Sequence, residues 1–148
     1  MATPNPTSVD IRDILSTAGV GTIGANSGWS ISVSREPLKP DTCITIFDRP
    51  SFLEPDPKWL LEHPNFQVRI RGSENNYLSA TTKAQEIKDL LLGIQPQLRN
   101  GTKYRGIWQV SDIIPLGYDE QNRPILTMNF RCLREPTSTG TNRIPLST

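Results

Sequence analysis

The sequence has few of the residues that build metal and redox sites. Among 148 residues there are two cysteines, Cys43 and Cys132, and one histidine, His63. Two cysteines cannot form a disulfide framework, so we expect both thiols to be free in a reducing cytosol. A zinc site built from several histidines is excluded within one chain. We therefore expect neither a metal nor another cofactor.

The chain also lacks long apolar runs and an excess of charge of either sign. No segment reaches the roughly 18 to 20 apolar residues that span a bilayer. Residues 1–6 have neither the basic nor the apolar region of a signal peptide, so we expect no secretion and no membrane contact. Sixteen Lys and Arg stand against fifteen Asp and Glu, which leaves a net charge of +1. This balance argues against a free nucleic-acid-binding protein, because such proteins usually carry a basic excess.

The length of the chain fits one domain over residues 1–148. Thirteen prolines predict short elements joined by stiff loops. Residues 1–7 are expected to form an extended N-terminal segment. Residues 136–148, rich in Ser, Thr and Pro, are expected to form an extended C-terminal arm.

Two segments show helical periodicity. The first begins at Thr7, which can serve as its cap, and ends at Gly19. The second is capped by Asn75 or Asn76 and ends at Gly93. Their apolar stripes consist of Ile11, Ile14, Leu15 and Ala18 in the first helix, and of Tyr77, Ala80, Ala84, Ile87 and Leu91 in the second.

Five segments have strand character, at residues 29–33, 42–47, 66–70, 104–114 and 125–134. The last two flank the turn sequence at residues 117–124 and predict a long C-terminal hairpin. The order of elements indicates an α+β fold. We expect a mostly antiparallel or mixed sheet on which both helices pack.

The hairpin has one apolar and one polar side in this interpretation. The apolar side would unite Trp108, Val110 and Ile114 with Leu126, Met128, Phe130 and Cys132. The polar side would set Arg105, Gln109 and Asp112 against Asn129, Arg131 and Arg134. We expect this polar side to meet a neighbouring chain, where Asp112 would pair with an arginine across the contact. A solvated face that only keeps the protein soluble is the alternative.

Two further regions are candidates for subunit contacts. Residues 48–64 contain four prolines, yet they also carry Phe52, Trp59 and Leu60, too much apolar surface for a solvated loop. This loop covers either a subunit interface or a small core of its own. Arg69 and Arg71 lie on one strand face, where they could pair with acidic residues of another chain or contact nucleic acid.

No catalytic arrangement is evident in the sequence. Residues 19–24, GVGTIG, match the dinucleotide motif G-x-G-x-x-G, but that motif needs a strand before it and a helix after it. Here a helix precedes and a strand follows, so the glycines are expected only to end a helix. His63 has no nucleophile near it in sequence. We expect no enzyme, although a small ligand-binding domain that uses the glycine loop stays an alternative.

Several segments together carry a resemblance to a known family. They are PKWLL (57–61), FQVRIRG (66–72), AQEIKD (84–89), IWQVSDII (107–114), GYDEQNRP (117–124) and NFR (129–131). In their order and spacing, residues 42–136 resemble the tail terminator proteins of long-tailed bacteriophages, also called tail completion or minor capsid proteins.

The resemblance implies a small α/β fold and a structural role in the virion. Such proteins form a hexameric ring, assembled in the host cytoplasm, that caps the finished tail tube. The implied partners are further copies of the chain, the tail tube protein and the head connector or stopper. Another neck ring, a head-completion or stopper protein, is the alternative. We expect genomic DNA to pass through the ring without specific contact, because a net charge of +1 supplies little attraction.

Overall fold

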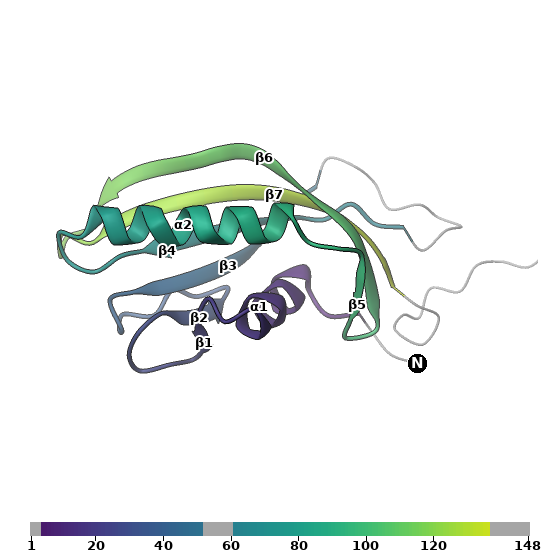
Figure 1. Ribbon diagram of the computed structural model, residues 1–148, viewed down its shortest axis with the longest axis horizontal. Coiled ribbons are helices and arrows are strands. Elements are labelled where there is room, and N and C mark those ends of the chain that lie inside the picture. Colours follow the sequence, from purple (N-terminus) through teal and green to yellow (C-terminus); the bar gives the residue numbers. More distant parts are fainter. Residues whose placement is uncertain (1–3, 52–60, 137–148) are drawn as a thin grey trace, which may run out of the picture.

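In the computed structural model a curled sheet wraps around two helices (Figure 1). Residues 4–51 and 61–136 are described. The helices are α1 (Thr7–Thr17) and α2 (Tyr77–Leu92). The strands are β1 (Thr22–Ile23), β2 (Ser30–Val33), β3 (Cys43–Arg49), β4 (Asn65–Arg71), β5 (Gln97–Arg99), β6 (Thr102–Tyr118) and β7 (Pro124–Pro136). The expected α+β class, with a long C-terminal hairpin, is confirmed.

The sheet is mixed, with the strand order β1-β2-β3-β4-β7-β6-β5. The strands β1, β2 and β3 run parallel, and all other neighbours are antiparallel. Because β2 and β3 are parallel neighbours, the chain must return along the sheet between them. This return is made by residues 34–42, which we call the crossover loop.

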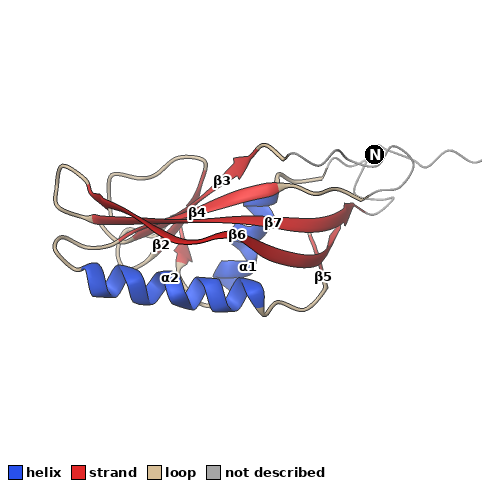
Figure 2. Cartoon of the chain, turned by 90° about the horizontal axis from the view of Figure 1, so that it is seen from above, coloured by secondary structure: helices blue, strands red, loops and turns tan. Residues whose placement is uncertain are grey.

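Both helices cover the same face of the sheet, which we call the inner face (Figure 2). α1 contacts mainly β2 and β3, and α2 contacts mainly β6 and β7. The alternate residues of the central strands meet them there in one apolar core: Ile44, Ile46, Phe66, Val68, Ile70, Leu126, Met128 and Phe130. The rings of Phe66 and Phe130 stack at 5.2 Å between centroids. Each such side chain contributes roughly 1.5 to 3 kcal/mol through burial.

The second helix follows the sequence expectation closely. Asn76 caps it, since its side chain accepts a hydrogen bond from the Ser79 amide at 3.1 Å. The helix ends at Gly93, and four of the five expected stripe residues are buried, whereas Tyr77 is exposed. Gly72 allows the close approach of this helix to β4, because a Cβ at Gly72 would stand 2.8 Å from the Cβ of Ala80.

The first helix differs from expectation in its cap and in one residue of its apolar stripe. Pro6 occupies the cap position, no side chain caps the helix, and Thr7 is already its first helical residue. Ala18 lies beyond the last turn and is exposed, while Gly19 ends the helix with a φ of +82°. Pro6 suits the position before a first turn because the missing N–H there has no helical partner.

The expected apolar side of the hairpin is wrong for β6. Trp108 lies opposite the exposed Arg131, and it is 48% exposed itself. The residues of β6 that enter the core are Tyr104 and Ile107. The register shifts between Tyr104 and Gly106, and again at three later points. Each irregular step of this kind exchanges the row of side chains that faces the core, so strict alternation failed here.

Candidate assembly surface

The crossover loop is fastened to the outer face of the sheet by Arg71, the last residue of β4. Its guanidinium group donates to the carbonyl oxygens of Asp41 at 2.9 Å and Pro37 at 2.7 Å. It also forms an ion pair with Glu36 at 2.8 Å, and Glu36 pairs with Arg69 at 2.8 Å. Arg69 and Arg71 were expected to present a basic face, but both pair with Glu36 of the same chain. Arg71 is buried, and both guanidinium groups are paired inside the chain.

A second arginine attaches the β6–β7 turn to the same loop. Arg123 pairs with Asp119 at 2.7 Å and with Asp41 at 3.1 Å, and it donates to the carbonyl oxygen of Leu38. Burial acts to lower the pKa of Arg123, but its bonds to Asp119 and Asp41 outweigh burial and raise it. The crossover loop and the hairpin turn are thus joined by the guanidinium group of Arg123, which stays protonated.

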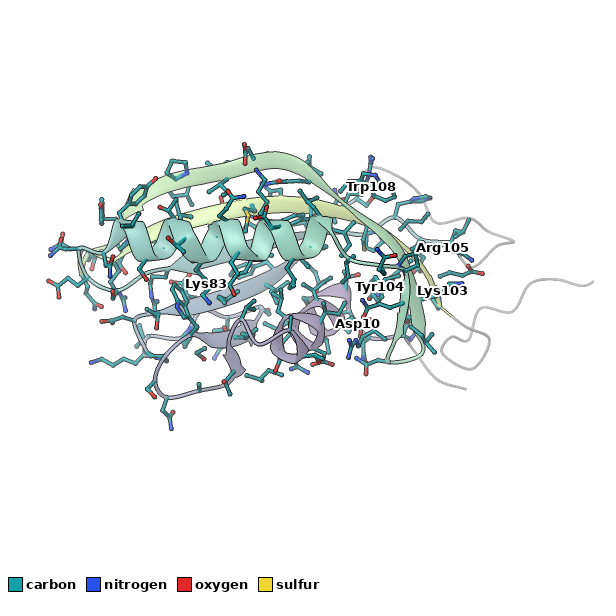
Figure 3. All side chains as sticks on the ribbon, viewed as in Figure 1. Asp10, Lys83, Lys103, Tyr104, Arg105 and Trp108 are labelled. Carbon is teal, nitrogen blue, oxygen red and sulfur yellow. The ribbon has the colours of Figure 1, made fainter. Side chains whose placement is uncertain are left out.

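A buried polar cluster joins α1 to the start of β6. Asp10 is fully buried, although it lies on the first turn of a helix. The Tyr104 hydroxyl donates to one of its carboxylate oxygens, and Asn100 donates to the other at 2.8 Å. Figure 3 shows Asp10 and Tyr104 close together between α1 and β6. Burial, and then the bond to Asp10, raise the pKa of Tyr104 far above its ordinary value, so the hydroxyl stays protonated.

Arg134 extends this cluster to three separate parts of the chain. Its Nη1 donates to the Tyr104 hydroxyl at 3.3 Å and to the carbonyl oxygen of Asn5 at 2.8 Å. Its Nε pairs with Glu62 at 2.8 Å. The expected place of Arg134 on the polar side of the hairpin is wrong. It is an even-numbered residue of β7 and therefore shares the inner face with Cys132.

The side of the outer face away from the crossover loop carries polar side chains of β4, β7 and β6. A line of hydrogen bonds crosses it, from Gln67 to Asn129 at 3.2 Å and from Asn129 to Ser111 at 3.2 Å. A shallow groove of about 490 Å³ follows this line. It is lined by Arg49, Pro50, Asn65, Phe66, Gln67, Val110, Ser111, Ile114, Asn129 and Phe130.

Large apolar side chains stand exposed along β6. They are Trp108, Val110, Ile114, Leu116 and Tyr118, and we call them the β6 row. Figure 3 shows Trp108 directed away from both helices. Arg131 lies over its ring, with 5.7 Å between the guanidinium carbon and the ring centroid. This combination of apolar and cationic surface is typical of protein interfaces.

Asp112, expected to pair with an arginine of another chain, forms an ion pair within its own chain. Its carboxylate accepts from Lys88 of α2 at 2.9 Å and from the backbone amide of Ile113 at 2.7 Å. These bonds, that of Lys88 above all, hold the pKa of Asp112 below its ordinary value. Asp112, the one charged residue from Gly106 to Tyr118, is thereby paired.

The remaining candidates show no catalytic geometry in the described residues. Cys43 and Cys132 are both buried, and burial raises their pKa values to about 11 and about 12. Thiols in such surroundings are poor nucleophiles. No group of His, Cys, Asp and Glu in the described part of the chain could hold a metal ion.

The glycine motif is not a dinucleotide site. Gly19 ends α1, residues 22–23 form β1, and β2 follows. Without a helix after Gly24, no helix N-terminus is available for a pyrophosphate. The dinucleotide interpretation of these glycines is therefore wrong.

Three of the expected contact residues, Phe52, Trp59 and Leu60, lie outside the described residues. The hydrogen bonds of Arg134, Asn100 and Arg71 were beyond sequence reasoning, because their partners are 30 to 129 residues away. The buried role of Asp10 could have been predicted, because the sequence places this carboxylate on the apolar side of a short helix.

Comparison with known proteins gives the family. The family described as bacteriophage tail terminator protein matches residues 14–136, which confirms the resemblance found over residues 42–136. A chain of the "Virion of native gene transfer agent (GTA) particle" has a similar fold, with a TM-score of 0.65 at 13% identity over 86% of this chain and 93% of that one. The structure titled "Np_888769.1" matches with a TM-score of 0.44 at 12% identity, over 69% and 77% of the two chains. No curated protein matches the sequence.

The function of the family agrees with the site. No helix in the described part of the chain is long and apolar enough to cross a membrane. The outer surface offers apolar and hydrogen-bonding contacts, and the buried charges fasten loops to the sheet. The chain belongs to the bacteriophage tail terminator proteins, structural proteins of the virion tail that associate with other tail components.

Proposed function

We propose that this chain forms a ring, with six copies as the family resemblance implies, that closes the tail tube and joins it to the head connector. The observation that carries this proposal is the family match over residues 14–136, nearly the whole described chain. The ring leaves a central channel for DNA. Its function is the geometry of its contacts, with no chemical step.

The fastened loops support a ring subunit of fixed shape. In a closed ring each copy repeats the same angle to the next, so a small error in one subunit is multiplied around the circle. Arg71 and Arg123 fix the crossover loop, and Arg134 fixes the residues around Asn5 and Glu62. Buried polar networks with all partners in place stiffen a structure in this way.

The loop that carries Phe52, Trp59 and Leu60 contributes to the subunit contact in this proposal. Its apolar content supports this role, since aromatic anchors are enriched where interfaces are strongest. Glu62, near the C-terminal end of residues 48–64, is held by Arg134 and by backbone bonds of 2.8 and 3.0 Å to the same residue. Glu62 is therefore held against β7.

DNA passes the ring without tight binding. Many of the arginines are neutralised within the chain, among them Arg69, Arg71, Arg105, Arg123 and Arg134. Little positive charge is left to release counterions from a duplex. Fluorescence anisotropy with a labelled duplex should give a dissociation constant weaker than about 10⁻⁶ M at physiological salt. Nanomolar binding would contradict this part of the proposal.

Electron microscopy of the purified protein tests the ring directly. Negative stain should show rings with a central hole, and tubes of the tail tube protein should carry such a ring at one end after mixing. Tail assembly without this chain should give tubes of irregular length. A protein that stays monomeric at all concentrations, or rings that never associate with tubes, would overturn the proposal.

A further inference from the structure

The outer edge of β6 is long and mostly free. β6 has 17 residues, and β5 pairs only with Thr102–Tyr104. In residues 4–51 and 61–136 no other strand pairs with this side of β6. Pro115 has no N–H, and the amide of Ile113 is bound to Asp112, so the readily paired part lies before these residues. The unpaired N–H and C=O groups along an edge of this length can form hydrogen bonds with a strand of another chain.

The side chains of this edge lack the charges that usually prevent such pairing. From Gly106 to Tyr118 the only charged residue is Asp112, and Lys88 of the same chain compensates it. The β6 row stands exposed over the same stretch, with Val110 at 62% and Leu116 at 55%. Edge strands in water normally carry lysines or inward-pointing charges. An apolar row on a free edge therefore marks a contact with protein.

The opposite edge of the sheet has the same character. It consists of β1 and the end of β2, and no charged residue occurs from Ile14 to Ser34. β1 pairs only with Ser30 and Ile31, and Ile23 is 43% exposed. In Figure 1 the edge strand β6 follows the upper margin of the molecule and β1 lies at the lower margin. One sheet thus presents two edges on opposite sides, one uncharged and the other with Asp112 as its single charged residue from Gly106 to Tyr118.

These two edges match the requirement for a ring. If β6 paired with β6 of a second copy, the contact would close as a two-fold dimer and no ring would grow. A ring needs two different surfaces that meet head to tail. The geometry points to a contact in which the free edge of β6, with its exposed row, receives the β1–β2 edge of a second copy of this chain. This inference rests on the proposed ring.

Charge substitutions on each edge test the contact. Val110→Lys alters the β6 edge, and Ile23→Lys alters the β1 edge. Each should weaken assembly by about tenfold or more, because the contact would bury an unpaired charge. Leu78→Lys is the control, since Leu78 is 77% exposed but lies on α2, which covers the inner face. Rings should form normally in this control. Sedimentation velocity measures assembly, and thermal melting checks that each monomer is folded.

A mixture of the two variants separates this contact from other arrangements. Val110→Lys keeps an intact β1 edge, and Ile23→Lys keeps an intact β6 edge. Their equimolar mixture should therefore form dimers but no rings, while each variant alone stays monomeric. If either variant fails to fold, Leu116→Lys or Thr22→Lys takes its place, because both positions are exposed.

The outcomes distinguish this inference from the proposed function. Normal rings from both variants would overturn the edge contact and leave the ring function intact. Monomeric variants whose mixture gives no dimer would overturn the pairing of β6 with β1. Wild-type protein that never self-associates would overturn both. Wild-type assembly that the variants abolish, but that never caps a tube, would support the contact and overturn the ring's function in the tail.

Discussion

The hydroxyl of Tyr104 donates a hydrogen bond to the carboxylate of Asp10, a fully buried residue 94 positions earlier in the chain. This contact joins the first helix to the strand that carries the exposed β6 row. Asn100 donates to the same carboxylate, and Arg134 donates to the hydroxyl from the other side. A buried carboxylate is costly unless its oxygens are bonded, so each member of the cluster stabilises the others.

Tyr104→Phe should destabilise the protein by about 1 to 3 kcal/mol, because it leaves an oxygen of buried Asp10 without its donor. Urea unfolding followed by circular dichroism measures this loss. Tyr118→Phe removes the same hydroxyl from an exposed residue near the hairpin turn and should change the free energy of unfolding very little. Equal effects of both substitutions would show that the buried hydrogen bond to Asp10 contributes no more to stability than an exposed hydroxyl does.

Arg71→Met should cost about 3 to 5 kcal/mol, because several carbonyl oxygens of the crossover loop lose their donor and Glu36 keeps only its pair with Arg69. Limited proteolysis should then cut within residues 34–42, which the wild type protects. Arg105→Met, in the exposed pair with Glu135, is the control and should cost less than about 1 kcal/mol. An intact loop in Arg71→Met would contradict the fastening role.

Both thiols should resist modification in the folded protein. Burial raises the pKa of Cys43 to about 11 and that of Cys132 to about 12, from an ordinary value of 9.0. A thiol reagent at pH 8 should react with both only after denaturant is added. Because these values are raised on folding, stability should fall as the pH rises above about 9. Fast labelling of the native protein, or constant stability up to pH 11, would contradict this.

Arg131→Glu should weaken ring assembly and leave the monomer folded. Arg131 is exposed, and its guanidinium group lies over the aromatic ring of Trp108. Reversal of its charge removes that cation–π contact and alters the surface beside the β6 row. Lys39→Glu is a suitable control, since Lys39 is exposed on the crossover loop. Rings of normal size in light scattering would show that this part of the hairpin is not at the interface.

Local signals accounted for the regular parts of the fold. Asn76 and Gly93 bound α2 as expected, because caps and glycines act within one helical turn. The row of Phe66, Val68 and Ile70 faced the core as expected, since β4 has neither a bulge nor a break. The parallel strand β1 was missed because two residues carry no periodicity.

The faces of the hairpin strand β6 could not be assigned from local alternation. Alternation assigned Trp108 and Val110 to the core, but bulges moved them to the outer face. A bulge depends on how two strands fit over their whole length, and no local residue pattern announced it here. The same shift produced the exposed row on which the proposed subunit contact rests.

The sequence by itself determined the fold class, the second helix, the order of the long strands and the resemblance to tail terminators, because each depends on short-range patterns or on segments in a fixed order. Only the tertiary structure decided the roles of the charged residues. Arg71 and Arg134 read as surface charges along their strands, yet they are buried against partners 35 and 72 residues away. Whether an arginine contacts a neighbour or holds its own chain together depends on what the fold brings beside it, and sequence spacing does not contain that information.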